Sequence, residues 1–246
     1  MGLFSSIGSA VGSFCSSVGS AIGSACSAIG SAVSSFASGI GTVIGGIVSA
    51  LSPVAAALGK FANTFLQALG ILKPNEDTQE MGDRALQAAD KGITIDKFEN
   101  FDEYMAALRD FKLEPEQTAK RSSAEKMVAG LGVGTIATEE KFNLERGSLN
   151  GMWLLPMANP SYFTPERMQT LVSTGRLGGD IFAYLEKRLS AGDTRTMEKR
   201  LEINSDGSAM NNSELDTLYD ELHAARDNFA DLDKQAEAKH SQAQGV

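Results

Sequence analysis

One eleven-residue unit repeats four times in tandem between Gly8 and Leu51: GSAVGSFCSSV, GSAIGSACSAI, GSAVSSFASGI and GTVIGGIVSAL. Glycine begins each unit, and a second small residue follows four positions later. These positions are Gly8, Gly12, Gly19, Gly23, Gly30, Ser34, Gly41 and Gly45. Because eleven residues make three helical turns at about 3.67 residues per turn, each column of the repeat stays on one face. The repeat therefore predicts a helical glycine zipper, in which small residues four apart let another helix approach closely.

The remaining columns define two further faces of this helix. Large apolar residues at spacings of three, four and seven form a stripe that suits lipid. They occupy both odd and even positions, which argues against a strand, since a strand requires a period of two. Hydroxyl side chains form a third, uncharged face, which we expect to border water in a pore. These candidate pore-lining residues are Ser9, Ser13, Ser16, Ser20, Ser24, Ser27, Ser31, Ser35, Ser38, Thr42 and Ser49.

The N-terminal region carries almost no charge. No Asp, Glu, Lys or Arg precedes Lys60, and Lys60 is the only charged side chain up to Leu72. A membrane-spanning helix takes about 20 residues, so two repeat units match one crossing, at residues 8–29 and again at 30–51. The alternative is one continuous helix of about 66 Å through all four units.

Two smaller features complete this region. Ser52 and Pro53 predict the N-cap and first position of a third apolar helix, which ends near Leu72. Cys15 and Cys26 fall in the same column, too far apart along one helix for a disulfide, and we interpret them as small packing residues.

The composition changes abruptly after Leu72. All 31 acidic residues, and all basic residues except Lys60, lie in this second part. A strongly acidic surface argues against nucleic acid as a partner. The apolar run has no basic segment before it and is too long for a secretory signal, so we expect cytoplasmic synthesis and export without a signal peptide.

Helix-start signals recur through the acidic part. They are Asp96 with Glu99, Glu114-Pro115, Thr164-Pro165-Glu166, and Ser213 with Asp216. Glycines 130, 132 and 134 predict a turn, Asn159-Pro160 and residues 203–212 predict loops, and residues 213–239 predict a long terminal helix. The predicted fold class is all-α, with glycine-zipper hydrophobic N-terminal helices (residues 1–72) and an acidic, mostly helical C-terminal domain (residues 73–246).

The terminal helix carries apolar residues at alternating spacings of three and four. They are Leu215, Leu218, Leu222, Ala225, Phe229 and Leu232. The seam has too few heptads to argue for a separate coiled coil, so we expect it to pack within its own domain.

Catalytic and metal-binding signals are weak. His223 and His240 have no serine or cysteine motif beside them, and no cluster of metal ligands is visible. Asn204, Asp206 and Gly207 resemble the middle of a calcium loop, but Ser213 occupies the place of the bidentate glutamate. We therefore expect no catalytic residue, no metal and no cofactor, and a protein that is not an enzyme.

The glycine-zipper head, the acidic helical remainder and the absent secretory signal together resemble a pore-forming antibacterial effector of bacterial type VI secretion. The motif part of this resemblance covers residues 1–72. It implies transport inside the haemolysin-coregulated tube protein, delivery to the periplasm of a target cell, and oligomeric insertion into that cell's inner membrane. It also implies a pore that passes small monovalent cations and dissipates the membrane potential, and a cognate membrane immunity protein in the producer.

Two other functions fit the same features. A phage pilot or ejection protein also joins a Gly/Ala/Ser-rich apolar head to a charged helical body, and forms a conduit across the envelope. A hydrolase domain with a membrane-entry head is the second alternative, although no spacing of carboxylates selects a catalytic pair.

Overall fold

The computed structural model describes residues 22, 26 and 28–243, and the described residues form helices without any strand. The predicted all-α class is confirmed. From residue 31 onward the elements are α2 (Ser31–Phe36), the π-helix η1 (Ala37–Gly41), α3 (Thr42–Ala50), α4 (Ser52–Ala68), α5 (Thr78–Asp90), the 3-10 helix η2 (Ile95–Lys97), α6 (Phe101–Asp110), α7 (Pro115–Lys120), α8 (Ser123–Lys141), α9 (Leu154–Ala158), α10 (Pro165–Ser173), α11 (Ile181–Leu185), α12 (Ala191–Arg200) and α13 (Asn212–Ala243).

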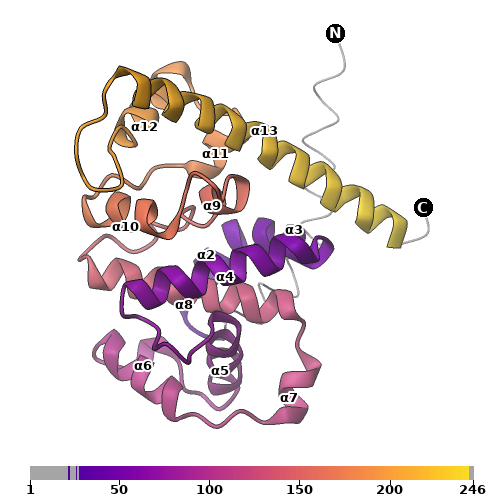
Figure 1. The fold of residues 1–246 in the computed structure, drawn as a ribbon. Helices are drawn as coiled ribbons and strands as arrows, with labels where there is room; N and C mark the ends of the chain where they lie inside the picture. The colour runs from indigo at the N-terminus through magenta and orange to yellow at the C-terminus, as the bar shows by residue number, and fades with distance from the viewer. Residues whose placement is uncertain (1–21, 23–25, 27, 244–246) are drawn as a thin grey trace.

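Two helices run across the middle of the molecule, and the others pack on either side of them (Figure 1). α4 and α8 form this central layer. The helices α5, α6 and α7 lie on one side of it, and α9 to α13 lie on the other. α13 runs diagonally past α3 towards the C-terminus.

The central helix α8 begins with a capping box. The Ser122 hydroxyl accepts a hydrogen bond from Glu125 N, and the Glu125 carboxylate accepts one from Ser122 N. The helix then continues through Gly130, Gly132 and Gly134, so the turn predicted at these glycines is wrong. Glycine is a poor helix former, but tertiary packing overrides that preference when another backbone must come close.

The close approach occurs where α5 crosses α8. A Cβ added to Gly130 would lie 1.9 Å from the carbonyl oxygen of Thr78, and one added to Gly82 would lie 2.0 Å from that of Lys126. Only hydrogen fits at both positions. Asp83 of α5, 2% exposed, adds α7 to this pair of helices: it accepts a hydrogen bond from Thr118 Oγ1 of α7 (2.6 Å) and lies 3.9 Å from Lys126 Nζ of α8.

Two of the predicted helix starts are confirmed and two are displaced. α7 begins at Pro115, and Thr164 caps α10 by accepting a hydrogen bond from Arg167 N. The predicted capping box at Asp96 and Glu99 is wrong, because residues 95–97 form a 3-10 turn and the next α-helix begins at Phe101. Asn100 caps that helix: its side-chain oxygen accepts a hydrogen bond from Glu103 N.

The start of the terminal helix also differs from the Ser213–Asp216 prediction. Asn211 accepts a hydrogen bond from Glu214 N, and Glu214 accepts one from Asn211 N, so the reciprocal pair lies two residues earlier. The helix then runs to Ala243, beyond the predicted end at residue 239. Its seam packs within the chain as expected: Leu218, Leu222, Ala225 and Phe229 are buried, and Leu215 and Leu232 are half-buried.

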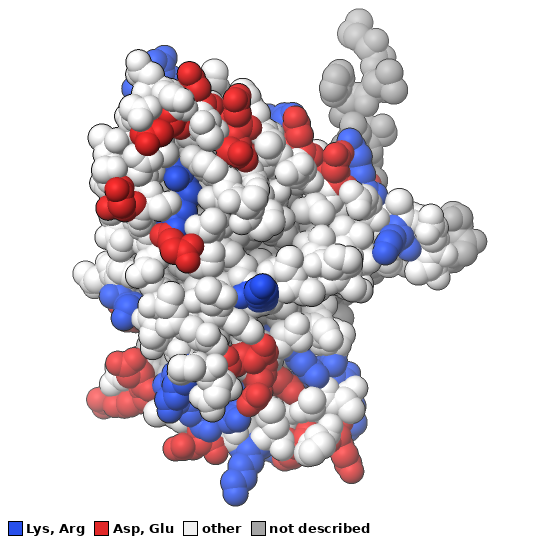
Figure 2. Space-filling view, in the orientation of Figure 1, with Lys and Arg blue, Asp and Glu red and all other residues white. Residues whose placement is uncertain are grey.

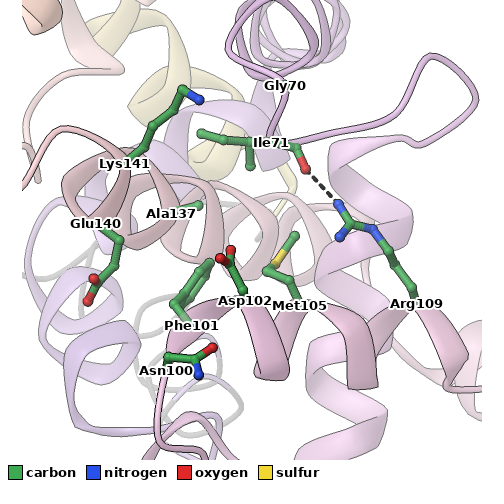
Figure 3. Close-up of a pocket in the computed structure, with 10 residues that line it drawn as sticks. All are labelled: Gly70, Ile71, Asn100, Phe101, Asp102, Met105, Arg109, Ala137, Glu140 and Lys141. Carbon is green, nitrogen blue, oxygen red and sulfur yellow. Dashed lines mark hydrogen bonds between the residues drawn. The ribbon is translucent and has the colours of Figure 1, made fainter.

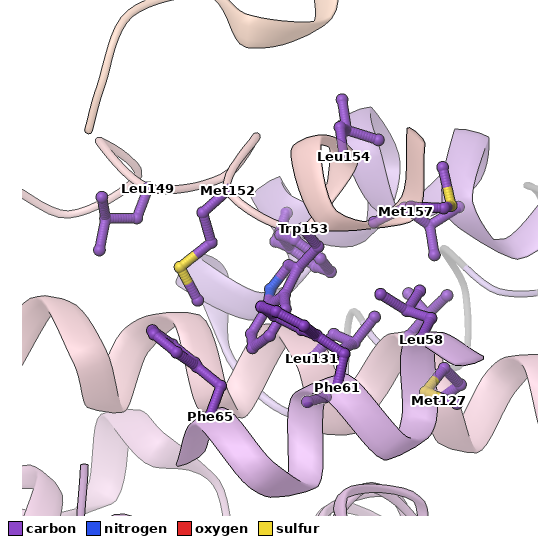
Figure 4. Close-up of a cluster of buried hydrophobic side chains, with 14 of the residues drawn as sticks. Leu58, Phe61, Phe65, Met127, Leu131, Leu149, Met152, Trp153, Leu154 and Met157 are labelled. Carbon is purple, nitrogen blue, oxygen red and sulfur yellow. The ribbon is translucent and has the colours of Figure 1, made fainter. Parts of the chain in front are cut away.

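An aromatic cluster fixes α4 against the segment before α9 (Figure 4). The Trp153 ring meets Phe61 and Phe65 edge-on, with centroids 6.4 and 5.8 Å apart, and its Nε1 donates to Thr135 Oγ1 of α8 (2.8 Å). Edge-to-face pairs of this kind add stability beyond their buried area. The helix predicted after Ser52 is confirmed, with Ser52 as its first residue rather than its cap, but it ends at Ala68, earlier than the predicted end near Leu72.

The described part of the N-terminal region shares its hydrophobic core with the acidic part. Ile44 and Ile47 of α3, Phe65 of α4 and Val128 of α8 belong to one continuous cluster of buried side chains. The boundary near residue 72 therefore marks a change in composition, while the packing continues across it.

The α5–α8 crossing predicts a large effect of one methyl group. Gly130→Ala should lower the free energy of unfolding by about 3 kcal/mol, because the new Cβ meets backbone atoms that cannot rotate away. Urea unfolding followed by circular dichroism measures this. Gly39→Ala is the matched control: nothing lies within 4 Å of an added Cβ there, so stability should stay equal or rise by up to about 1 kcal/mol. Equal behaviour of the two variants would contradict the crossing as described.

Candidate membrane-insertion segment

The second half of the repeat forms one apolar helix of 20 residues, Ser31–Ala50, made of α2, η1 and α3. It contains no charged residue. Among the described residues, it is the one helix that is long and apolar enough to cross a membrane. In its most apolar stretch, 56% of the residues are buried in the protein. Its bounds agree with the predicted crossing at residues 30–51, and the helical interpretation of the repeat is confirmed for this half.

Both ends of this helix are backbone breaks. Gly30 has φ 145° and ψ 163°, a conformation that favours glycine, and Leu51 leaves the helix with φ −119° and ψ 83°. The alternative of one continuous helix through four repeat units is therefore wrong at Gly30. The break is held from outside the repeat, because Ile95 N donates a hydrogen bond to the carbonyl of Ile29 (3.0 Å).

The glycine column packs against another part of the same chain. A Cβ added to Gly41 would lie 2.8 Å from Val128 Cγ1, and one added to Gly45 would lie 3.4 Å from Val128 Cγ2 and 2.4 Å from Ile22 Cδ1. Ser34 is half-buried within α2, and Gly30 lies outside the helix. The other predicted zipper positions, Gly8, Gly12, Gly19 and Gly23, lie outside the described residues.

The serine face is separate from this packed face. Ser31, Ser35, Ser38 and Ser49 are exposed, and Thr42 is half-buried. Hydroxyls on this face bond within their own helix: Ser38 to the Ser35 carbonyl, Thr42 to Ala37 and Ser49 to Gly46. The remaining candidate pore-lining residues, Ser9, Ser13, Ser16, Ser20, Ser24 and Ser27, lie outside the described part of the chain.

The C-terminal half of the segment is covered on more than one side. Five consecutive residues, Ile44 to Val48, are buried, although successive helix positions point about 100° apart. α3 packs against α4, α8 and α13. A helix that is apolar on all sides is typical either of a protein core or of a membrane span.

Sequence reasoning missed the receiving surface on α8. Gly132 meets Val33 and Phe36 (both 3.1 Å from an added Cβ), and Gly134 meets Leu66 of α4 (2.8 Å). The glycines from 130 to 134 therefore serve close helix packing, as the glycines of the repeat do. Their spacing carried that signal, but the sequence interpretation assigned it to a turn.

One carboxyl group of α13, the helix that packs against α3, has a raised pKa. Asp233 is half-buried between Phe229 and Ala236, and burial, together with the carboxylates of Glu237 and Glu186, raises its pKa to about 6. Cys26, also in the core, has its thiol pKa raised to about 12 by burial, so it stays protonated and unreactive.

A pocket outside this segment is lined by charged side chains, and two of them form ion pairs within the protein. This pocket, of about 330 Å³, lies between α6, α8 and the turn after α4 (Figure 3). Its Arg109 donates to the Ile71 carbonyl (2.8 Å) and pairs with Glu76 (2.9 Å), while Glu140 pairs with Arg146. Arg109 and Glu140 are therefore engaged by other parts of the protein, while Asp102 and Lys141 also line the pocket.

A second hollow, of about 470 Å³, adjoins α2 and contains Glu139 of α8. This side chain is 1% exposed, and burial raises its pKa. Its oxygens accept hydrogen bonds from Gly147 N (3.1 Å) and Leu149 N (2.9 Å), so it fastens the loop that follows α8.

The loop that resembles a calcium site is closed by its own hydrogen bonds. Glu214 accepts hydrogen bonds from Asn204 Nδ2 and Asn211 N, and Asp206 accepts from Ser208, which lowers the pKa of both carboxyls. Within the described residues no group of three or more His, Cys, Asp or Glu is placed to hold a metal. His223 is exposed on α13.

Comparisons with known proteins add no relative. No protein-family model, no curated protein and no solved structure matches this chain. The functional argument therefore depends on the segment Ser31–Ala50, its packing and the composition of the repeat.

The raised pKa of Asp233 predicts how stability depends on pH. The folded pKa of about 6 exceeds the ordinary value, so its contribution to stability is fully present at acidic pH and is lost as pH rises through about 6. Solvent screening at a half-buried position limits that loss to about 1–2 kcal/mol. Asp233→Asn should raise the free energy of unfolding by this amount at pH 7.5 and have little effect at pH 4.

Chemical unfolding at several pH values measures this difference. Asp220→Asn, at an exposed position of the same helix, is the control and should show no such pH-dependent gain. A gain at pH 4 equal to that at pH 7.5 would show that Asp233 is not the titrating group.

Proposed function

We propose that this protein is a pore-forming antibacterial toxin that inserts its glycine-zipper region into the inner membrane of a target bacterium. One observation carries the proposal: Ser31–Ala50 is an uncharged helix of membrane-spanning length, and more than half of its most apolar stretch is buried in the protein. Several copies would pack through their glycine faces and let small monovalent cations pass along the serine face, which would dissipate the membrane potential.

The arrangement of the three faces supports this proposal. The glycines at 41 and 45 admit a closely packed helix, the large residues Ile40, Ile44 and Ile47 suit lipid, and the exposed serines carry hydroxyl dipoles without charge. Hydroxyl oxygens can replace part of an ion's hydration shell in a narrow pore. Separate surfaces for packing, lipid and water are what a helix in an oligomeric pore requires.

Charged side chains on the surface of the protein are compatible with a toxin that travels in water before it meets a membrane. Figure 2 shows a band with few charged side chains across the middle of this face, between regions where acidic and basic side chains gather. Carriage by the haemolysin-coregulated tube protein, and neutralisation by a membrane immunity protein, belong to the proposal through the resemblance to type VI effectors.

Two neighbouring substitutions should differ in their effect on the depolarisation of vesicles that carry a potassium gradient and a potential-sensitive dye. Ile40→Asp puts a carboxylate on the lipid-facing stripe, at a cost of about 2.5–3.5 kcal/mol for insertion, and should lower depolarisation on the order of a hundredfold. Ser38→Asp puts the same charge on the water-facing side. It should preserve depolarisation and increase the preference for cations over anions.

Both positions are at least partly exposed in the soluble protein, so both variants should fold, as thermal unfolding can verify. Ser213→Asp, in the exposed first turn of α13, is the control and should behave as the unsubstituted protein. Failure of the unsubstituted protein to depolarise any vesicle would contradict the proposed function. Full activity of Ile40→Asp would show that this segment does not enter lipid.

A further inference from the structure

Two helices of the N-terminal region, Ser31–Ala50 and α4, are attached to the rest of the protein in different ways. α4 is held by polar tethers as well as by packing. The side-chain oxygen of Asn63 accepts hydrogen bonds from Thr78 N (2.8 Å) and Thr78 Oγ1 (2.6 Å), and Gln67 donates to the Glu76 carbonyl (3.1 Å). Transfer of α4 into hydrocarbon would leave these groups without partners, which is costly.

The segment Ser31–Ala50 is held by apolar contacts. Its side-chain hydrogen bonds, from Ser38, Thr42 and Ser49, end on carbonyls of the segment itself and would survive its removal. Across the interface with α8, its glycines meet the methyl groups of Val128. Because lipid chains are as apolar as a protein core, a bilayer can replace such contacts without an unpaired polar group.

The bounds of the segment coincide with the two backbone breaks. Gly30 and Leu51 leave the helical conformation, whereas residues between them form one uninterrupted helix. The surface beneath the segment is fixed, since α8 is locked to α5 at Gly82 and Gly130. The segment can therefore depart as a unit while α8 keeps its place.

We infer that the contact of Gly41 and Gly45 with Val128 is autoinhibitory. Activation then releases the segment Ser31–Ala50, with Gly30 and Leu51 as hinges, while α4 stays packed on α8. This inference rests on the proposed pore function, and it states which part of the molecule moves. α8 acts in the soluble protein as the close-packing neighbour that other helices provide in the membrane.

Two covalent locks distinguish release of this segment by itself from release of the segment together with α4. The first, Val33→Cys with Gly132→Cys, joins the segment to α8 outside its glycine face; the second, Leu66→Cys with Gly134→Cys, joins α4 to α8. A Cβ added to Gly132 lies 3.1 Å from Val33 Cγ1, one bond from the Val33 Cβ, so the first pair comes near the Cβ separation of about 3.5–4.5 Å that a disulfide requires. At Gly134 the close atoms are the δ-methyl groups of Leu66 (2.8 and 3.2 Å), so the second pair of thiols is joined by a short cross-linker that reduction cleaves. Both pairs are made with Cys15→Ser and Cys26→Ala, and mass spectrometry verifies each link.

The vesicle depolarisation assay is run on each locked protein and again after reduction. The first lock should reduce the rate at least about tenfold, because it removes the released population, and reduction should restore the rate. The second lock should leave the rate unchanged in both states. The single-cysteine variants serve as controls for the substitutions themselves.

Every outcome decides the inference. Equal activity of the oxidised and reduced first lock would overturn it and leave the pore function standing. Loss of activity with either lock closed would also overturn it, since α4 would then have to leave with the segment. If the cysteine-free protein itself fails to depolarise vesicles, the proposed function falls and the inference falls with it.

Discussion

The crossing of α5 and α8 is the constraint on which the other contacts depend. At Gly82 and Gly130 the two backbones are so close that no side chain fits between them, and Asp83 joins α7 to the same unit. α8 is thereby held in place and offers a fixed surface to the helices that pack on its other sides. α2, α3 and α4 all pack on this helix, and Trp153 reaches it through Thr135.

The storage of a membrane-length helix in this protein follows from the kind of surface that α8 presents. Glycine and valine offer shape and apolar area but no directional bond. Such a surface suits a helix that, in the mechanism proposed above, is packed in water and later leaves. Glycines lower the intrinsic stability of the segment by about 1 kcal/mol each relative to alanine. Close packing offsets that penalty, whether the neighbour is α8 or another helix in lipid.

Much of the fold could be predicted from local patterns, and the exceptions have a common cause. The helical class, the helix after Ser52, and the helix starts at Pro115 and Thr164 depend on interactions within a few residues, and these predictions are confirmed. The error at Gly130 to Gly134 arose because local propensity predicts a turn where a distant helix in fact requires glycine.

The candidate segment shows the same division between local and distant information. Its length and three faces followed from the period of the repeat, whereas a boundary between residues 29 and 30 was one of two alternatives that the sequence left open. Gly30 has the same sequence context as the other leading glycines, and the hydrogen bond from Ile95, 66 positions beyond residue 29, distinguishes it. The contact between Val128 and the glycines of the segment could not be predicted either, because a valine in the sequence does not indicate which distant glycine it will contact.

The position of Leu51 has a topological consequence for any state in which the preceding helix spans a bilayer. α4 and everything after it then remain on the side of entry, with all of the protein's charged side chains, because none precedes Lys60. Residues 1–30 would then enter or cross the membrane as well. They contain no Asp, Glu, Lys or Arg, so their side chains add no cost of charge translocation.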